Sequence, residues 1–351
     1  MTRLSVIMPT NRDNLTAISR IAQACSWAGP HTEVIISDNS GSASKGRLLA
    51  QIENENCHIM VGDPCGPQEN SRKAFEKAKG DFVMLVCDDD LCFDRGIAAL
   101  PEKIEGVVHD ASVVGIVGTT VVDGARGSSV PAVCDLDADD ALARLGGFFR
   151  LGMTPPILFS PIRREAVTWV TETLRQKPFR FSFDDYISVL LLLSRGRFVN
   201  LGRLLYCYDI GNWESFETAQ REDLKYYLEA SFDPAINKLH WLFCAFEGAV
   251  LIRNLVALSG YSLAQRQDMA DCWFAHMFKR FQLSKREDLG SPLSIEAEKL
   301  CVKWKGAAGQ LSFEAILADI CEFLVLASPK HAMTYFTYWS SFLDLRKAPA
   351  A

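Results

Sequence analysis

Three consecutive aspartates, Asp88, Asp89 and Asp90, follow Cys87 directly after an apolar run. Adjacent carboxylates repel one another and raise one another's proton affinity, so such a cluster is stable mainly where a cation neutralises it. Hard oxygen ligands of this kind suit Mg²⁺ or Mn²⁺, which would in turn bind a diphosphate. The alternative is a solvated acidic turn or a helix N-cap, because aspartate is common in both.

Polar segments also close two other apolar runs. Pro9, Thr10, Asn11 and Arg12 end the run that begins at Leu4, and a Ser-Asp-Asn-Ser segment containing Asp38 ends the next one. Turn chemistry explains either segment alone. Because the carboxyl ends of parallel strands meet at one edge of a sheet, the segments together predict the rim of a ligand pocket.

A second acidic pair, Asp184 and Asp185, opens a predicted helix farther along the chain. Such a carboxylate can act as a general base that deprotonates a hydroxyl during an in-line displacement. The alternative is negative charge that merely stabilises a helix N-terminus. Asp209 precedes Gly211 in a segment typical of turns, so it is either a metal ligand or a turn residue.

The elements that must position these residues alternate between strands and helices, which predicts an α/β fold with a doubly wound, mostly parallel sheet. Residues 154–159 are expected to be extended because they contain two prolines. The other expected strands are 4–8, 33–37, 58–61, 81–86, 112–122 and 198–208, and the expected helices are 15–27, 70–78, 91–104, 137–149, 164–174 and 183–194.

From about Tyr226 the pattern is helical only, with amphipathic stretches at 241–258, 264–281 and 313–326. We therefore expect a catalytic domain over 1–218 and an all-helical C-terminal domain over 219–351. An aromatic segment that begins at Tyr335 and includes Trp339 and Phe342 would pack in a core, form a dimer or lie on a membrane surface.

Composition narrows the class of protein. The chain has 351 residues, of which 48% are hydrophobic, and a formal net charge of -6 with no Lys/Arg run longer than two, which argues against a nucleic-acid partner. The 11 cysteines form no Cys-x-x-Cys pair, as expected of reduced thiols. Neither a signal-peptide core nor an apolar run of about 18 residues occurs, so a soluble cytoplasmic protein is expected.

Four segments in this order resemble the inverting glycosyltransferases of family 2, which have the GT-A fold. They are LSVIMPTNRD at 4–13, EVIISDNSGS at 33–42, ENSRKAFEKAKGDFVMLVCDDDL at 69–91 and FDDY at 183–186, and the resemblance covers about residues 1–215. It implies a GT-A-type fold and a metal-dependent transfer of a sugar from a nucleotide-diphosphate sugar, UDP-linked by preference, to an acceptor hydroxyl.

The resemblance also implies roles for individual residues. Asp185 is the expected general base, the second residue of a pair with Asp184. Cys87 stands where many relatives have aspartate, so Asp89 and Asp90 both remain candidate metal ligands, with Asp209 at or near the position of a metal-binding histidine. The residues expected to bind the nucleotide sugar are Pro9, Thr10, Asn11, Arg12, Asp38 (to the base), Asn70, Arg72, Asp88 and Asp89.

Expected acceptors are saccharides or lipid-linked saccharides in cell-surface polysaccharide or glycoconjugate synthesis, with peripheral contact at the inner membrane face and homo-oligomers through the helical domain as further possibilities. Two other classes of protein are kept as alternatives. One is a nucleotidyltransferase, although no Gly-rich phosphate loop follows the first strand. The other is a catalytically inactive sugar-binding or scaffold protein, which the Cys87 departure would fit.

Overall fold

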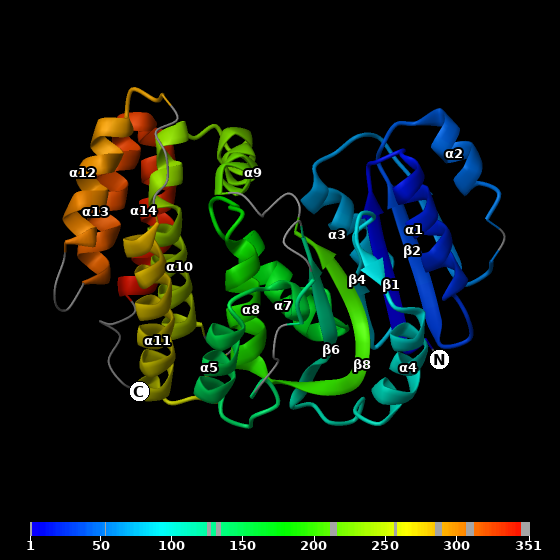
Figure 1. Cartoon of the computed structure of the whole chain (residues 1–351). Helices are drawn as coiled ribbons and strands as arrows, with labels where there is room; N and C mark the ends of the chain where they lie inside the picture. Colours follow the sequence, from blue (N-terminus) through cyan, green and yellow to red (C-terminus); the bar gives the residue numbers. More distant parts are fainter. Residues whose placement is uncertain are drawn as a thin grey trace. The chain divides into compact units, whose positions relative to one another are not determined.

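The computed structural model describes residues 2–52, 54–124, 128–130, 135–210, 216–255, 258–284, 290–306 and 312–344. They form two compact units (Figure 1). The sheet unit comprises residues 1–139, 150–169 and 195–211, and the helical unit comprises residues 140–149, 170–194 and 212–351. The last change of unit along the chain, at 211/212, lies near the boundary expected from the sequence. The sequence predicted a single boundary between two continuous domains. In the structure, residues 140–149 and 170–194 also belong to the helical unit.

The sheet in the described residues has eight strands in the order β3-β2-β1-β4-β7-β6-β8-β5. Neighbours from β3 to β4 pair in parallel, as do β6 and β8, whereas the two-residue strands β5 and β7 pair antiparallel. The mostly parallel sheet expected from the sequence is thus confirmed. The strands are β1 Leu4–Thr10, β2 Thr32–Asp38, β3 Cys57–Val61, β4 Phe82–Leu85, β5 Leu91–Cys92, β6 Val113–Asp123, β7 Ile162–Arg163 and β8 Arg197–Asp209.

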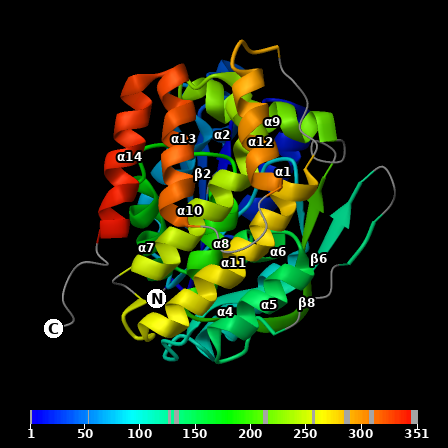
Figure 2. The ribbon, with the colours of Figure 1, turned by 90° about the vertical axis from the view of Figure 1, so that its left-hand side faces the viewer.

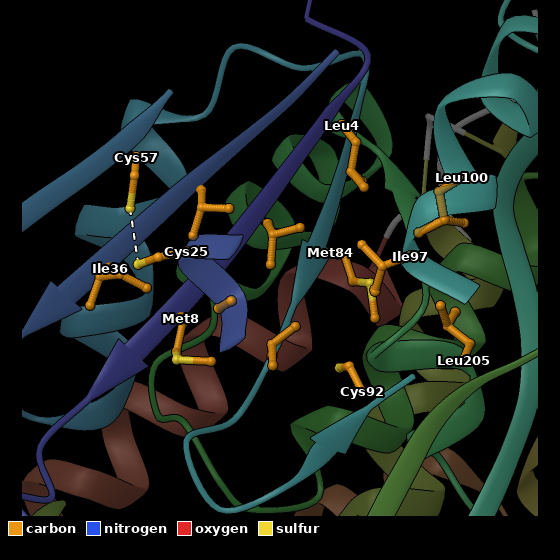
Figure 3. Packing of buried hydrophobic residues seen from close by; sticks show 14 of the residues in the cluster. Leu4, Met8, Cys25, Ile36, Cys57, Met84, Cys92, Ile97, Leu100 and Leu205 are labelled. Carbon is orange, nitrogen blue, oxygen red and sulfur yellow. Dashed lines mark hydrogen bonds between the residues drawn. The ribbon is translucent and has the colours of Figure 1, made fainter. Parts of the chain in front are cut away.

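Alternate residues of each strand point to opposite sides of the sheet. Because the strands carry apolar side chains on both sides, helices cover both faces. Leu4 and Met8 of β1 pack in one cluster with Leu100 of α4, as Figure 3 shows, whereas Ile7 packs on the other face with Ala74 of α3. The helices of the sheet unit are α1 Leu15–Ser26, α2 Ala43–Leu49, α3 Pro67–Lys77, α4 Asp94–Glu105 and α6 Pro155–Leu158.

The expectation that 154–159 would be extended is wrong. Pro155 and Pro156 begin α6, and the N–H of Ile157 donates to the carbonyl of Thr154 at 2.9 Å. Proline is tolerated in the first helical turn because the N–H groups there have no partner within the helix. The expected helix at 91–104 also begins later, because residues 91–92 form β5 and α4 starts at Asp94.

The helical unit confirms an all-helical C-terminal region, and Figure 2 shows its C-terminal helices facing the viewer. Three helices, α5, α7 and α8, have residues in both units, α8 only through its last residue, Arg195. The helices are α5 Ala141–Leu151, α7 Arg164–Arg175, α8 Asp184–Arg195, α9 Phe216–Glu229, the 3₁₀ helix η1 Pro234–Leu239, α10 His240–Asn254, α11 Leu263–Leu283, α12 Ser294–Lys305, α13 Phe313–Ala327 and α14 Pro329–Asp344.

Apolar side chains fill the centre of the helical unit. Residues 234–254 are long and apolar enough to cross a membrane, with a mean hydropathy of 1.3, but 89% of the most apolar 18-residue stretch within them is buried inside the structure. The core helix of a folded unit has the same properties. Tyr335 and Trp339 of α14 are fully buried, which confirms core packing for these two members of the aromatic segment.

Candidate functional site

The acidic segment and the loop after β1 meet at the carboxyl ends of two neighbouring strands. β1 and β4 pair in parallel, and the N–H of Val86 extends that ladder by donating to the carbonyl of Ile7. Thr10 at the end of β1 donates through Oγ1 to Oδ2 of Asp88 at 2.5 Å. The sheet therefore brings together the two segments that the sequence placed at a pocket rim.

Arg12 supplies positive charge to this acidic segment. Its guanidinium forms an ion pair with Asp88, and its second terminal nitrogen lies 2.8 Å from Oδ2 of Asp89. The Asp88 side chain is almost completely buried, whereas those of Arg12 and Asp89 are 41% and 37% exposed. The Asp88 side chain is therefore held in place by its contacts, whereas the carboxylate of Asp89 is accessible to a ligand.

Asp90 is buried and accepts two hydrogen bonds from β8, the strand that pairs with β5 directly after Asp90. The hydroxyl of Tyr206 donates to Oδ2 of Asp90, and the backbone N–H of Asp209 donates to Oδ1 at 2.9 Å. Burial raises the pKa of Asp90 to about 6, although both hydrogen bonds oppose the shift. The exposed side chain of Asp209 lies at the end of the same strand, so Asp209 contacts Asp90 through its backbone.

Among the described residues, Cys87, Asp89 and Asp90 each bring one ligand atom within 4.8 Å of the others. This group can hold a metal ion. Burial raises the pKa of the Cys87 thiol well above its usual value, and repulsion from Asp90 adds to the effect. A protonated thiol is a poor ligand for a hard cation, so the two carboxylates are the members that fit Mg²⁺ or Mn²⁺.

Lys45 is a site residue that the sequence reasoning missed. Its side chain is 1% exposed, and Nζ lies 2.9 Å from Oδ1 of Asp38. Nζ also donates to Oγ1 of Thr10 at 2.7 Å and to the carbonyl of Arg12 at 2.6 Å. One buried ammonium therefore ties the loop after β1 to the loop after β2. Asp38 is buried as well, and its Oδ1 also accepts from the N–H of Ser40.

Asn70 of α3 joins this network mainly through the end of β2 and the loop after it, and its amide also lies 3.5 Å from the carbonyl of Thr10 at the end of β1. Its amide nitrogen donates to the carbonyl of Ser37 and to Oδ1 of Asn39, both at 2.9 Å, and its oxygen accepts from Ser37 Oγ. Arg72 lies on the same helix, but its guanidinium forms ion pairs with Glu69 and Glu76 on the exposed surface. The structure thus brings Asn70, and not Arg72, into the polar network at the strand ends.

The two remaining residues expected at the first loop lie at its edges. Pro9 is part of β1, in register with Ser37 of β2, and Asn11 is exposed. Two cavities of about 320 and 510 Å³, lined by residues that include Ala99 and Val302 respectively, contain none of the expected site residues.

In the helical unit, Asp184 and Asp185 differ sharply in environment. Asp184 is buried, forms an ion pair with Lys177 and accepts from Nε of Arg180 at 2.6 Å. The Asp185 side chain is exposed, yet loss of hydration, followed by repulsion from Asp184, raises its pKa to about 6. Of the pair, Asp185 is the one that can exchange a proton with a ligand.

No protein-family model and no curated protein match the sequence. Among solved structures, the chain is similar to residues 1–349 of S. aureus TarS, with a TM-score of 0.55 and 16% identity over 98% of this chain and 92% of that one. The same TarS fragment in complex with UDP-GlcNAc gives a TM-score of 0.56, again at 16% identity with 98% and 92% coverage. Another TarS structure matches with a TM-score of 0.54 and 15% identity, over 97% of this chain and 55% of that one.

At this level of identity the likeness concerns the course of the backbone, which extends through both the sheet and the helices that follow it. The chain therefore has the GT-A-type fold of TarS, a mostly parallel α/β sheet followed by a helical C-terminal region.

Proposed function

We propose that the protein is an inverting glycosyltransferase that uses a nucleotide-diphosphate sugar, with a UDP-sugar favoured, and transfers the sugar to an acceptor hydroxyl. The observation that carries this proposal is the polar network at the ends of β1, β2 and β4, which joins Thr10, Arg12, Asp38 and Asp88 within a fold shared with a protein crystallised with UDP-GlcNAc. Ligands bind at this edge of open α/β sheets.

The donor would lie along this edge. Asp38 and Asn70 offer a carboxylate and an amide for the base and ribose, while Arg12 offers a guanidinium to the diphosphate. Among the three consecutive aspartates, Asp89 has the most accessible carboxylate. Asp90 lies beside it, so these two residues would hold Mg²⁺ or Mn²⁺. The bound cation would offset the negative charge of the departing nucleoside diphosphate.

Asp185 is the proposed general base. Its carboxylate takes the proton of the acceptor hydroxyl while the acceptor oxygen forms a bond to the anomeric carbon. The bond from that carbon to the diphosphate oxygen breaks, and the electron pair leaves with the nucleoside diphosphate. Its raised pKa and its exposure both support this role, because a base with a pKa of about 6 binds the proton well and remains ionised at neutral pH.

Beyond the reaction, we propose a saccharide or lipid-linked saccharide acceptor and a place in cell-surface polysaccharide or glycoconjugate synthesis, on the cytoplasmic side of the membrane. Homo-oligomers through the helical unit and peripheral membrane contact belong to the same proposal. The support for these is the resemblance of the sequence motifs together with the fold.

The direct test is hydrolysis or transfer from a panel of nucleotide sugars by purified protein with Mn²⁺ or Mg²⁺. Turnover is expected to need the metal and to be lost in Asp185→Asn, while that variant still binds UDP. Asp268→Asn, which changes an exposed aspartate on α11, is the matched control and should behave as the wild type.

Three results would contradict the proposal. Metal-independent turnover would exclude the role of Asp89 and Asp90, and full activity in Asp185→Asn would exclude the proposed base. Nucleotide-sugar binding without turnover under any condition would favour a scaffold protein that has lost its activity.

A further inference from the structure

A lysine with two carboxylates is buried in the helical unit. The side chain of Lys177, just after α7, is 0% exposed, and its ammonium contacts Asp184 at the start of α8 and Glu247 of α10. Nζ of Lys177 lies 2.5 Å from Oε2 of Glu247, although the contact lacks the alignment of a hydrogen bond. The hydroxyl of Tyr335 on α14 donates to Oε1 of Glu247 at 3.1 Å.

Such a group is costly for the fold. Each buried charge loses the free energy of hydration, and attraction between the partners offsets that loss only in good geometry. Apolar side chains of similar volume would often be equally stable in the same space. The cost is visible at Glu247, where burial raises the pKa to about 7 despite the opposing charge of Lys177. A contribution to the stability of the fold therefore does not explain why charged residues occupy these positions.

The network leads to the residue next to the proposed base. The carboxylate of Asp184 contacts Lys177, accepts from Nε of Arg180 at 2.6 Å and accepts from the backbone N–H of Phe181 at 3.3 Å. These contacts fix the chain from 181 to 184, where α8 begins. Asp185 is the next residue, so its backbone position depends on Asp184, which Lys177 contacts.

We propose that Lys177, held by Glu247 and Tyr335, is a positioning residue for the general base Asp185. The inference rests on the proposed function and deepens it, because it gives the C-terminal helices a part in the reaction. Helices α10 and α14 supply the groups that hold Lys177, Lys177 holds Asp184, and Asp184 fixes the helix start from which Asp185 projects.

The test uses Lys177→Met in the full chain. It leaves Glu247 and Asp184 without their shared cation, so the protein should be less stable. Lys177→Met combined with Glu247→Gln should restore part of that stability, because it removes one of the two carboxylates that lost the cation while Asp184 keeps Arg180. We expect kcat per folded molecule to fall by about tenfold or more in both variants, because a small misplacement of a catalytic group has effects of this size. The KM for the donor and the affinity for UDP should stay as in the wild type.

Leu324→Ala is the control for a loss of stability alone. Leu324 is fully buried in α13 and belongs to none of the contacts above. This variant should lower the melting temperature and leave kcat per folded molecule unchanged. A wild-type kcat in Lys177→Met, or a kcat that recovers together with stability in the double variant, would overturn the positioning role.

A second measurement separates this inference from the proposed function. Hydrogen exchange of the amides at 181–188 should become faster in Lys177→Met and stay unchanged in Leu324→Ala, whether or not a substrate is known. If the wild-type protein turns over no nucleotide sugar, the proposed function fails. If exchange at 181–188 does not respond to Lys177→Met, the positioning role fails instead.

Discussion

The acid limb of the pH profile gives the sharpest prediction about Asp185. A general base works only when it is ionised, so kcat should rise with pH through the pKa of this group and reach a plateau above it. Loss of hydration and repulsion from Asp184 raise that pKa to about 6; Asp223 of α9 adds to the shift and Arg180 opposes it. The rate should thus be about half of its plateau near pH 6 and about a tenth near pH 5. An ordinary aspartate, with a pKa of about 3.9, would keep about nine tenths of the plateau at pH 5.

The assay must separate Asp185 from Asp90, whose pKa is also about 6. The pH profile of kcat is therefore measured with saturating donor and metal. Under these conditions titration of the donor-binding and metal-binding residues affects the KM, so the acid limb of kcat reports Asp185. Asp184→Asn removes the neighbouring negative charge and leaves Lys177 and Arg180 with one partner fewer. Both changes lower the pKa of Asp185, so the limb should move to lower pH. A wild-type limb near pH 4, or a limb that does not move in Asp184→Asn, would refute the reasoning.

Three further substitutions test contacts that lie within the sheet unit or within the helical unit. Lys45→Met leaves a buried carboxylate without its cation, so unfolding in denaturant should show a loss of about 3–5 kcal/mol, and UDP should stabilise the variant less than the wild type. Gly248→Ala places a methyl group against the indole of Trp273 and should cost about 1–3 kcal/mol in the same measurement. Tyr206→Phe removes the donor that lowers the pKa of Asp90, so Mn²⁺ affinity at neutral pH, measured by calorimetry with UDP present, should fall about tenfold.

Each of these substitutions has a matched control. Arg47→Met changes an exposed cation on the same short helix as Lys45, and Gly260→Ala adds a methyl group where no atom lies within 4 Å. Tyr338→Phe removes a hydroxyl from α14 of the helical unit and leaves the contacts of Asp90 unchanged. If a control loses as much as its partner, the contact assigned to that partner is not the cause.

The sequence was sufficient for the sheet and for the clustering of its loops. Apolar runs such as Leu4–Met8 identify strands, and the rule that parallel strands present their carboxyl ends together places the loop at Thr10 and the acidic segment at Asp88 at the same edge of the sheet. The alternation of strands and helices gave both covered faces of the sheet. These features depend on local pattern and on topology, which are both encoded in short stretches of chain.

The missed features depend on long-range packing. Lys45 lies in a segment rich in serine and glycine that looks like a loop, and nothing local indicates that its ammonium turns inward to Asp38. Residues 170–194 contain the apolar run Leu190–Leu193, which could pack on a sheet or among helices, so the sequence could not assign them to the helical unit. The difference between Asp184 and Asp185 follows from the distant partner Glu247, through Lys177.

The central claim is that the carboxyl edge of the sheet binds a nucleoside diphosphate through a divalent cation held by Asp89 and Asp90. Calorimetric titration of the full chain with UDP tests it most directly, with and without Mn²⁺. We predict that binding needs Mn²⁺ and is lost in Asp89→Asn, while Asp137→Asn, at an exposed position of the sheet unit, binds as the wild type does. Equal UDP affinity without Mn²⁺, or in Asp89→Asn, would contradict the account.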